Sequence, residues 1–150
     1  MTDGFPNLDR PRFAEPAGTD PARIDLERAT DSALVELISG GSVPAFVALF
    51  DRTSDAVRAE LALGLPGAAR ISEIFAASYI EVWWLAGCHG AAERDITAWI
   101  IGIVRRRIAE GCRGTHRRDG PSVPEGPRPS YAELEIAALL RRPFDRLRQP

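Results

Sequence analysis

The sequence predicts an all-α protein, a small helical bundle with a disordered tail before it and a linker after it. Apolar residues recur every three or four positions through most of residues 31–110, which is the period of an amphipathic helix. No stretch alternates apolar and polar residues as a strand would. Glycine and proline divide the pattern at Gly40-Gly41 and Gly64-Leu65-Pro66-Gly67. A length of 150 residues suits one ordinary domain with tails.

The first two helices are expected on either side of the glycine pair. Thr30 or Asp31 is a suitable N-cap for the first helix, and Gly40-Gly41 ends it. The second helix begins near Ser42, has a proline in its first turn and runs to about Leu63. The expected apolar faces contain Ala33, Leu34, Leu37 and Ile38 in the first helix and Phe46, Val47, Leu49, Phe50, Val57 and Leu61 in the second.

Two longer helices and a short one are expected after residue 67. The third spans about 68–86, and the fourth begins with Asp95 near its N-cap and stops at Gly111. A short amphipathic segment follows from Tyr131 to Leu140. Six large apolar residues are expected in the core, namely Phe46, Phe50, Phe75, Trp99, Ile100 and Ile103.

These elements divide the chain into four segments. Residues 1–29 are acidic and rich in proline, and we expect a disordered tail there. Residues 30–113 are expected to form the helical domain. Proline and glycine recur through 114–130, which predicts a linker, and 131–150 holds the short C-terminal helix and a tail.

Positive charge is concentrated in and just after the fourth helix. The formal net charge of the chain is -2, yet residues 99–118 hold six arginines against one glutamate, a local net charge of +5. On the fourth helix the arginines lie beside small residues and opposite the apolar stripe, so a phosphate backbone could approach closely. The alternative is a solvated basic surface. The candidate DNA-binding residues are Arg105, Arg106, Arg113, Arg117 and Arg118.

The third helix is apolar on two sides. One stripe faces the expected core, and Ile80 and Trp84 lie on the opposite stripe. A helix of this kind either packs on both sides or meets a partner, and tryptophan is a common interface anchor. The alternative is that Trp84 folds down onto the following loop.

Metal, cofactor and catalytic chemistry are not indicated by the sequence. Cys88 and Cys112, each with a histidine nearby, lie at opposite ends of the fourth helix, roughly 25 Å apart. They are therefore not expected to share a zinc ion or a disulfide. The sequence has neither a glycine-rich phosphate loop nor a nucleophile–base spacing, so we expect neither a cofactor nor an enzyme.

A membrane location is not indicated either. No apolar run reaches the roughly 18 residues of a membrane span. The N-terminus is acidic, unlike a signal peptide. We therefore expect a cytoplasmic, nucleoid-associated protein with no membrane partner.

An ordered set of motifs is distributed over residues 31–113. The set comprises the Asp31 helix, the Gly40-Gly41 break, the Ala45-Phe46 helix, Glu73-Ile74, Tyr79-Ile80-Glu81-Val82-Trp83 and Ala98-Trp99-Ile100. Together these motifs resemble region two of the extracytoplasmic-function sigma factors of bacterial RNA polymerase. The resemblance implies a helical domain whose third helix grips the clamp helices of the large subunit of the polymerase core. It also implies that the fourth helix and the loop before it hold promoter DNA.

The resemblance assigns roles to particular residues. It places Arg105 and Arg113 on DNA-facing positions and residues 87–94 on the base-reading loop. On the third helix, Ala76-Ala77 stands where the family usually has Gln-Glu, so two polar contacts to polymerase are missing. With this pair and the outward apolar residues included, the candidate partner-binding residues are Glu73, Ile74, Ala76, Ala77, Tyr79, Ile80, Trp83 and Trp84.

Two functions are expected from these observations. The first is a sigma-factor-like transcription initiation protein that binds RNA polymerase, promoter DNA or both. Residues 137–143 resemble only the opening of region four, so we expect this protein to act without that second DNA-binding domain. The alternative is a protein-interaction module of the same fold that binds an anti-sigma-like or other regulator, or itself, through the third helix.

Overall fold

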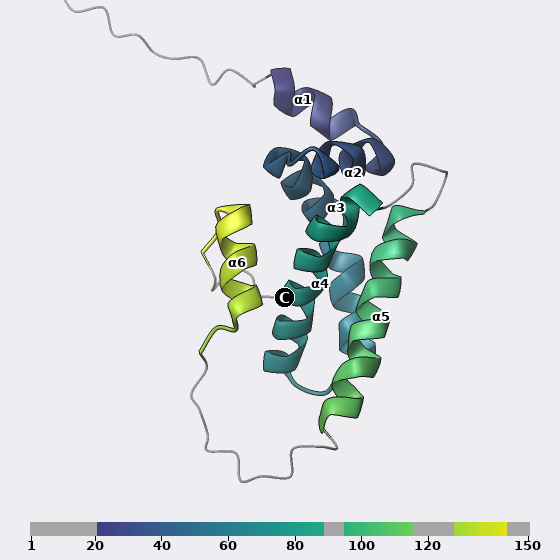
Figure 1. Ribbon diagram of the computed structural model, residues 1–150, viewed down its shortest axis with the longest axis vertical. Coiled ribbons are helices and arrows are strands. Elements are labelled where there is room, and N and C mark those ends of the chain that lie inside the picture. Colours follow the sequence, from purple (N-terminus) through teal and green to yellow (C-terminus); the bar gives the residue numbers. More distant parts are fainter. Residues whose placement is uncertain (1–20, 89–94, 116–127, 144–150) are drawn as a thin grey trace, which may run out of the picture.

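The computed structural model describes residues 21–88, 95–115 and 128–143, which form helices and short connections with no strand among them (Figure 1). The predicted all-α fold is confirmed for this part of the chain. The elements are α1 (Pro21–Arg28), α2 (Asp31–Ser39), α3 (Val43–Gly64), α4 (Ala68–Leu85), the 3-10 turn η1 (Ala86–Cys88), α5 (Ile96–Thr115) and α6 (Tyr131–Leu140).

The helix α4 lies at the centre of the bundle. It runs up the middle of Figure 1 with α6 on its left and α5 on its right, and α3 lies behind it. At one end of this group, α2 packs on α3 and η1, and α1 packs on α3. The central helix therefore has neighbours on three of its sides.

Side chains at the helix starts explain where the elements begin. The hydroxyl of Thr30 accepts a hydrogen bond of 3.2 Å from the backbone N–H of Ala33, and Ser42 does the same for Ala45 at 3.3 Å. The carboxylate of Asp95 caps α5 in the same way. Each bond satisfies an N–H group that the first turn of a helix leaves unpaired. The N-caps predicted from the sequence are confirmed at these three positions.

The core is built around aromatic rings from α3 and α4. The ring centroid of Phe50 lies 4.6 Å from that of Tyr79 and 5.6 Å from that of Phe75. Prediction and structure agree on the burial of Phe46, Phe50, Phe75, Ile100 and Ile103. The prediction is wrong for Trp99, which is only partly buried because it lies at the edge of this core.

Two further local predictions are wrong. On α2, Leu37 is 45% exposed, because the helix buries Val35 in its place. The helix α5 does not stop at Gly111 but continues to Thr115. A Cβ atom at Gly111 would lie 2.6 Å from a guanidinium nitrogen of Arg70 on α4. Gly111 therefore allows α5 to pack closely against α4 and does not end the helix.

The stretch from 21 to 28 forms α1, although the sequence placed it in a disordered tail. That prediction is wrong for this stretch, while residues 1–20 lie outside the described part of the chain. The helix is too short to be stable alone, so its order depends on contacts with the rest of the molecule.

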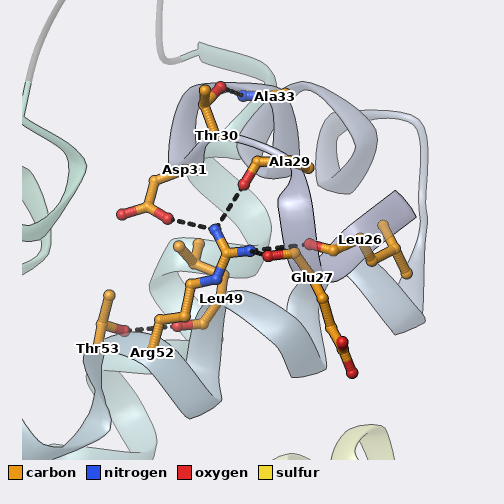
Figure 2. Close-up of polar contacts among 9 residues, drawn as sticks. All are labelled: Leu26, Glu27, Ala29, Thr30, Asp31, Ala33, Leu49, Arg52 and Thr53. Atoms are coloured by element: carbon orange, nitrogen blue, oxygen red, sulfur yellow. Dashed lines mark hydrogen bonds and ion pairs between the residues drawn. The ribbon is translucent and has the colours of Figure 1, made fainter. Parts of the chain in front are cut away.

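A single arginine of α3 supplies much of that contact. Figure 2 shows the guanidinium of Arg52 donating to the backbone carbonyls of Leu26, Glu27 and Ala29 at 2.7–2.8 Å. It also donates to the carboxylate of Asp31 at 2.8 Å. Carbonyls at the end of a helix lack partners within that helix. Arg52 therefore completes the C-terminal end of α1 and joins it to the start of α2.

The short C-terminal helix α6 is part of the bundle. Its predicted bounds are confirmed, and Ser130 and Glu133 form a capping box at its start. Its residues Ile136 and Leu140 are buried in the same core as α3, α4 and α5. The predicted end of the domain at residue 113 is therefore wrong, because α6 completes the core. Residues 116–127, most of the expected linker, lie outside the described residues.

Candidate functional site

The helix α4 presents four sides, of which neighbouring helices cover three. Successive residues turn by about 100°, so residues three or four positions apart share a side. Contacts with the neighbouring helices identify what covers each side. Arg70, Ile74 and Glu81 face α5, and Phe75 and Tyr79 face α3. Ser72 contacts α6, Trp83 lies between α6 and Phe46 of α3, and helical spacing places Ala76 on this same side. The remaining side is formed by Glu73, Ala77, Ile80 and Trp84. We call this last group the open stripe.

The side toward α5 is held by an ion-pair group. The carboxylate of Glu81 accepts hydrogen bonds from Arg106 and, at 2.7 Å, from Arg107. On the same side Ile74 is only 7% exposed and lies beside α5 at Gly111. Ile74, a candidate partner-binding residue from the sequence, is therefore a core residue in this structure.

The side toward α3 contains a buried pair of hydroxyl groups. Those of Tyr79 and Thr53 lie 2.7 Å apart, and Thr53 donates to the carbonyl of Leu49 at 2.9 Å. Because the Thr53 proton is used in that bond, Tyr79 is the donor to Thr53. Burial raises the pKa of the Tyr79 hydroxyl well above its usual value. Tyr79 is also core, so its predicted place in a partner surface is wrong.

The side toward α6 is covered along its length. Near the start of α4, Ser72 donates a hydrogen bond to the carboxylate of Glu133, which is only 2% exposed. Near its end, the half-buried Trp83 borders a small hollow together with Leu139 of α6. Ala76 lies between these contacts and is only 1% exposed. A partner therefore cannot touch Ala76 while α6 stays in this position.

The open stripe contains the other candidate residues from the sequence. The side chain of Trp84 is 68% exposed, Glu73 is exposed, and Ala77 and Ile80 are half-buried. The alternative prediction was that Trp84 folds down onto the loop that follows α4. Residues 89–94 of that loop lie outside the described part of the chain. An exposed tryptophan beside an isoleucine is a combination that is common in protein interfaces.

The first candidate DNA-binding arginine is paired with an acid from another helix. The Nε atom of Arg105 donates to Glu60 of α3 at 2.6 Å. The hydrogen bond from Arg105 lowers the pKa of the Glu60 carboxyl, and the pairing raises that of the guanidinium. Arg105 remains 67% exposed, so the pair lies at the surface and adds little to stability.

The next arginines of α5 are paired as well. Arg106 and Arg107 share Glu81, and the Nε atom of Arg106 lies 3.9 Å from Glu110. With Arg105 and Glu60 included, three guanidinium groups meet three carboxylates, and their formal charges cancel. The sequence did not indicate this, because two of the acids come from α3 and α4. The side chain of Arg113 and the whole of Arg117 and Arg118 lie outside the described part.

A groove of about 670 Å³ lies between α1, α3 and α6. Apolar residues such as Val43, Val47 and Leu139 line it. Two of the charged residues that line it, Asp51 and Arg142, pair with each other at 2.6 and 2.7 Å. The pairing raises the pKa of the Arg142 guanidinium. These two charged groups of the lining therefore neutralise each other.

Within the described residues, no group of three histidine, cysteine, aspartate or glutamate side chains is placed to hold a metal ion. Cys88 and Cys112 are exposed and are not joined to each other. None of the described helices combines the length and apolarity needed to cross a membrane. Comparison of the chain with protein-family models, curated proteins and solved structures gives no match.

Proposed function

We propose that this chain is a sigma-factor-like transcription protein that acts by binding the RNA polymerase core through α4. The observation that carries this proposal is the open stripe, because it leaves Trp84 exposed on a helix that the bundle encloses on its other sides. The motifs in residues 31–113 support the choice of partner. Their resemblance to sigma region two assigns the polymerase contact to this helix.

The chemistry of the open stripe suits a protein partner better than nucleic acid. Ile80 and Trp84 offer apolar area, and covering such a side chain contributes about 1.5–3 kcal/mol. The small Ala77 lets a partner helix approach closely, and Glu73 adds a negative charge that phosphate would avoid. The paired arginines of α5 also weaken the electrostatic attraction that DNA binding requires.

The first prediction tests this surface with purified RNA polymerase core. We expect Trp84→Asp to weaken binding of the full chain by about thirtyfold, the loss of ~2 kcal/mol typical of a central interface tryptophan. Leu63→Asp is the matched control, because Leu63 is 88% exposed on the last turn of α3. We expect this control to bind like the parent.

Thermal unfolding of both variants checks that the fold is intact, because surface substitutions usually change stability by less than about 0.5 kcal/mol. Equal affinity of the parent and Trp84→Asp for the polymerase would contradict the proposal.

The alternative function, self-association or binding of another regulator, uses the same exposed tryptophan. Sedimentation of the purified chain at increasing concentration separates self-association from polymerase binding. A dimer that Trp84→Asp dissociates, with no affinity of the parent for polymerase, would favour the interaction module.

A further inference from the structure

We infer that α6 is an intramolecular cover over part of the partner surface of α4, and that the polymerase binds more tightly when α6 is displaced. The inference rests on the proposed function, since it concerns regulation of the same site. Its structural basis is the division of the candidate residues between the open stripe and the side that α6 covers.

The covered side and the open stripe belong to one continuous surface of α4. Ala76 lies three positions after Glu73 and four before Ile80, and Trp83 lies three positions after Ile80, so each covered residue adjoins the open stripe on the helix surface. The sequence motifs assign members of both groups to the same partner. A partner seated on the open stripe would meet α6 at its edge, and it could reach Ala76 only after α6 had moved away.

The contact between α6 and the bundle has features of a displaceable helix. Of its large apolar residues, Ile136 and Leu140 are buried, while Tyr131 is 81% exposed and Leu134 is 52% exposed. The contact also encloses the carboxylate of Glu133, and burial of an ionisable group reduces the gain from docking. Ten residues cannot form a stable helix in isolation, so α6 holds its shape mainly while docked.

Polar contacts at its two ends fix the position of α6. At its start, Glu133 accepts hydrogen bonds from the Ser72 hydroxyl and, at 2.7 Å, from the backbone N–H of Ser130. Just after its end, Arg142 forms two hydrogen bonds with Asp51 of α3. These contacts make the docked position specific, and they also allow it to be weakened by substitutions outside α4.

The experiment releases α6 in the full chain and measures two independent quantities. Ile136→Glu places a carboxylate at a fully buried position, and Arg142→Gln removes the surface ion pair as a milder second variant. Tyr131→Glu adds the same charge at the exposed surface of α6 and is the control for Ile136→Glu. Amide hydrogen exchange across residues 131–140 reports displacement, and titration with purified polymerase core reports affinity.

We expect Ile136→Glu to increase exchange in α6 while the protected amides of α3 and α4 keep their rates. In the same variant the affinity for polymerase should rise at least about tenfold, because a covered site lowers the apparent affinity by the fraction of molecules that are open. Arg142→Gln should change both quantities in the same direction by a smaller factor. Tyr131→Glu should change neither.

The outcomes separate this inference from the proposed function. If Trp84→Asp weakens polymerase binding but displacement of α6 leaves the affinity unchanged or lower, the proposed function stands and the cover is rejected. If neither the parent nor any α6-released variant binds polymerase, both are rejected. If Ile136→Glu prevents folding, Arg142→Gln decides in its place. Arg142 and its partner Asp51 both lie at the surface, so the loss of this ion pair should leave the fold intact.

Discussion

Tyr79 holds its hydroxyl group inside the core, and burial there disfavours the ionised form of that group. The side chain has no exposed surface and donates to Thr53. The neutral form is favoured in the folded state, so the pKa of Tyr79 is higher in the folded chain than in the unfolded chain. Its contribution to stability is therefore complete below the unfolded pKa of about 10 and is lost as pH rises above it.

The second prediction follows from this titration. We expect the free energy of unfolding of the parent to fall above about pH 10, with a slope approaching 1.4 kcal/mol per pH unit, roughly the value for one proton. Denaturant unfolding between pH 8 and 11 measures it. The chain contains no lysine, so no lysine titration overlaps this range.

Tyr79→Phe should remove this part of the slope and cost about 1 kcal/mol at neutral pH, because Thr53 loses its donor. Tyr131→Phe, at an exposed position, is the control and should keep the slope. An identical slope in the parent and Tyr79→Phe would show that Tyr79 does not titrate in this way.

At the scale of elements, α1 depends on a side chain from another helix. Eight residues do not hold a helix by themselves, and Arg52 supplies the hydrogen bonds that complete its C-terminal end. The order of α1 is therefore a tertiary effect, although the helix is local in sequence.

The third prediction tests this dependence. Arg52→Met keeps most of the side-chain volume and removes the donors, and we expect a loss of about 1–3 kcal/mol in the free energy of unfolding. Amide exchange in α1 should accelerate more than exchange in α3. Arg28→Met, at an exposed position of α1, is the control and should have little effect. Unchanged protection of α1 in Arg52→Met would mean that other contacts hold this helix.

At the scale of the whole molecule, the distribution of charge depends on how the helices pack. The arginines of α5 form a basic run in the sequence, yet α3 and α4 bring Glu60 and Glu81 against them. The described arginines of this run, at 105 to 107, are therefore paired with acids that lie 25 to 45 positions away in the chain.

The fourth prediction concerns DNA. We expect the parent to bind promoter-like duplex or single-stranded DNA weakly at physiological salt. The double variant Glu60→Gln and Glu81→Gln should bind more tightly and with a steeper salt dependence, because its guanidinium groups become available to phosphate. Electrophoretic mobility shift or anisotropy at several salt concentrations measures both. The double variant Glu27→Gln and Glu36→Gln, at exposed acids on α1 and α2, controls for the change of two in net charge. Tight, salt-sensitive binding by the parent would show that the ion pairs open readily for DNA.

The sequence was sufficient for local features and insufficient for those that depend on distant segments. The caps at Thr30, Ser42 and Asp95 act within one turn of a helix, so residue type and position predicted them. The apolar stripe of α5 was predicted for the same reason. Whether Ala76 is covered depends on α6, and whether Arg105 is paired depends on α3, so neither could be predicted from a single helix.

The connection between α5 and α6 sets how a displaced α6 would behave. The C-terminal end of α5 and the N-terminal end of α6 both lie near the first turns of α4, with Gly111 beside Arg70 and Glu133 beside Ser72. The two ends joined by residues 116–127 are therefore separated by about two helix spacings, ~20 Å. A segment tethered this closely has an effective concentration in the millimolar range, whatever the concentration of the protein. Dilution of the chain would not uncover α4, so the occupancy of the site would depend on the stability of docked α6 and on the concentration and affinity of the partner.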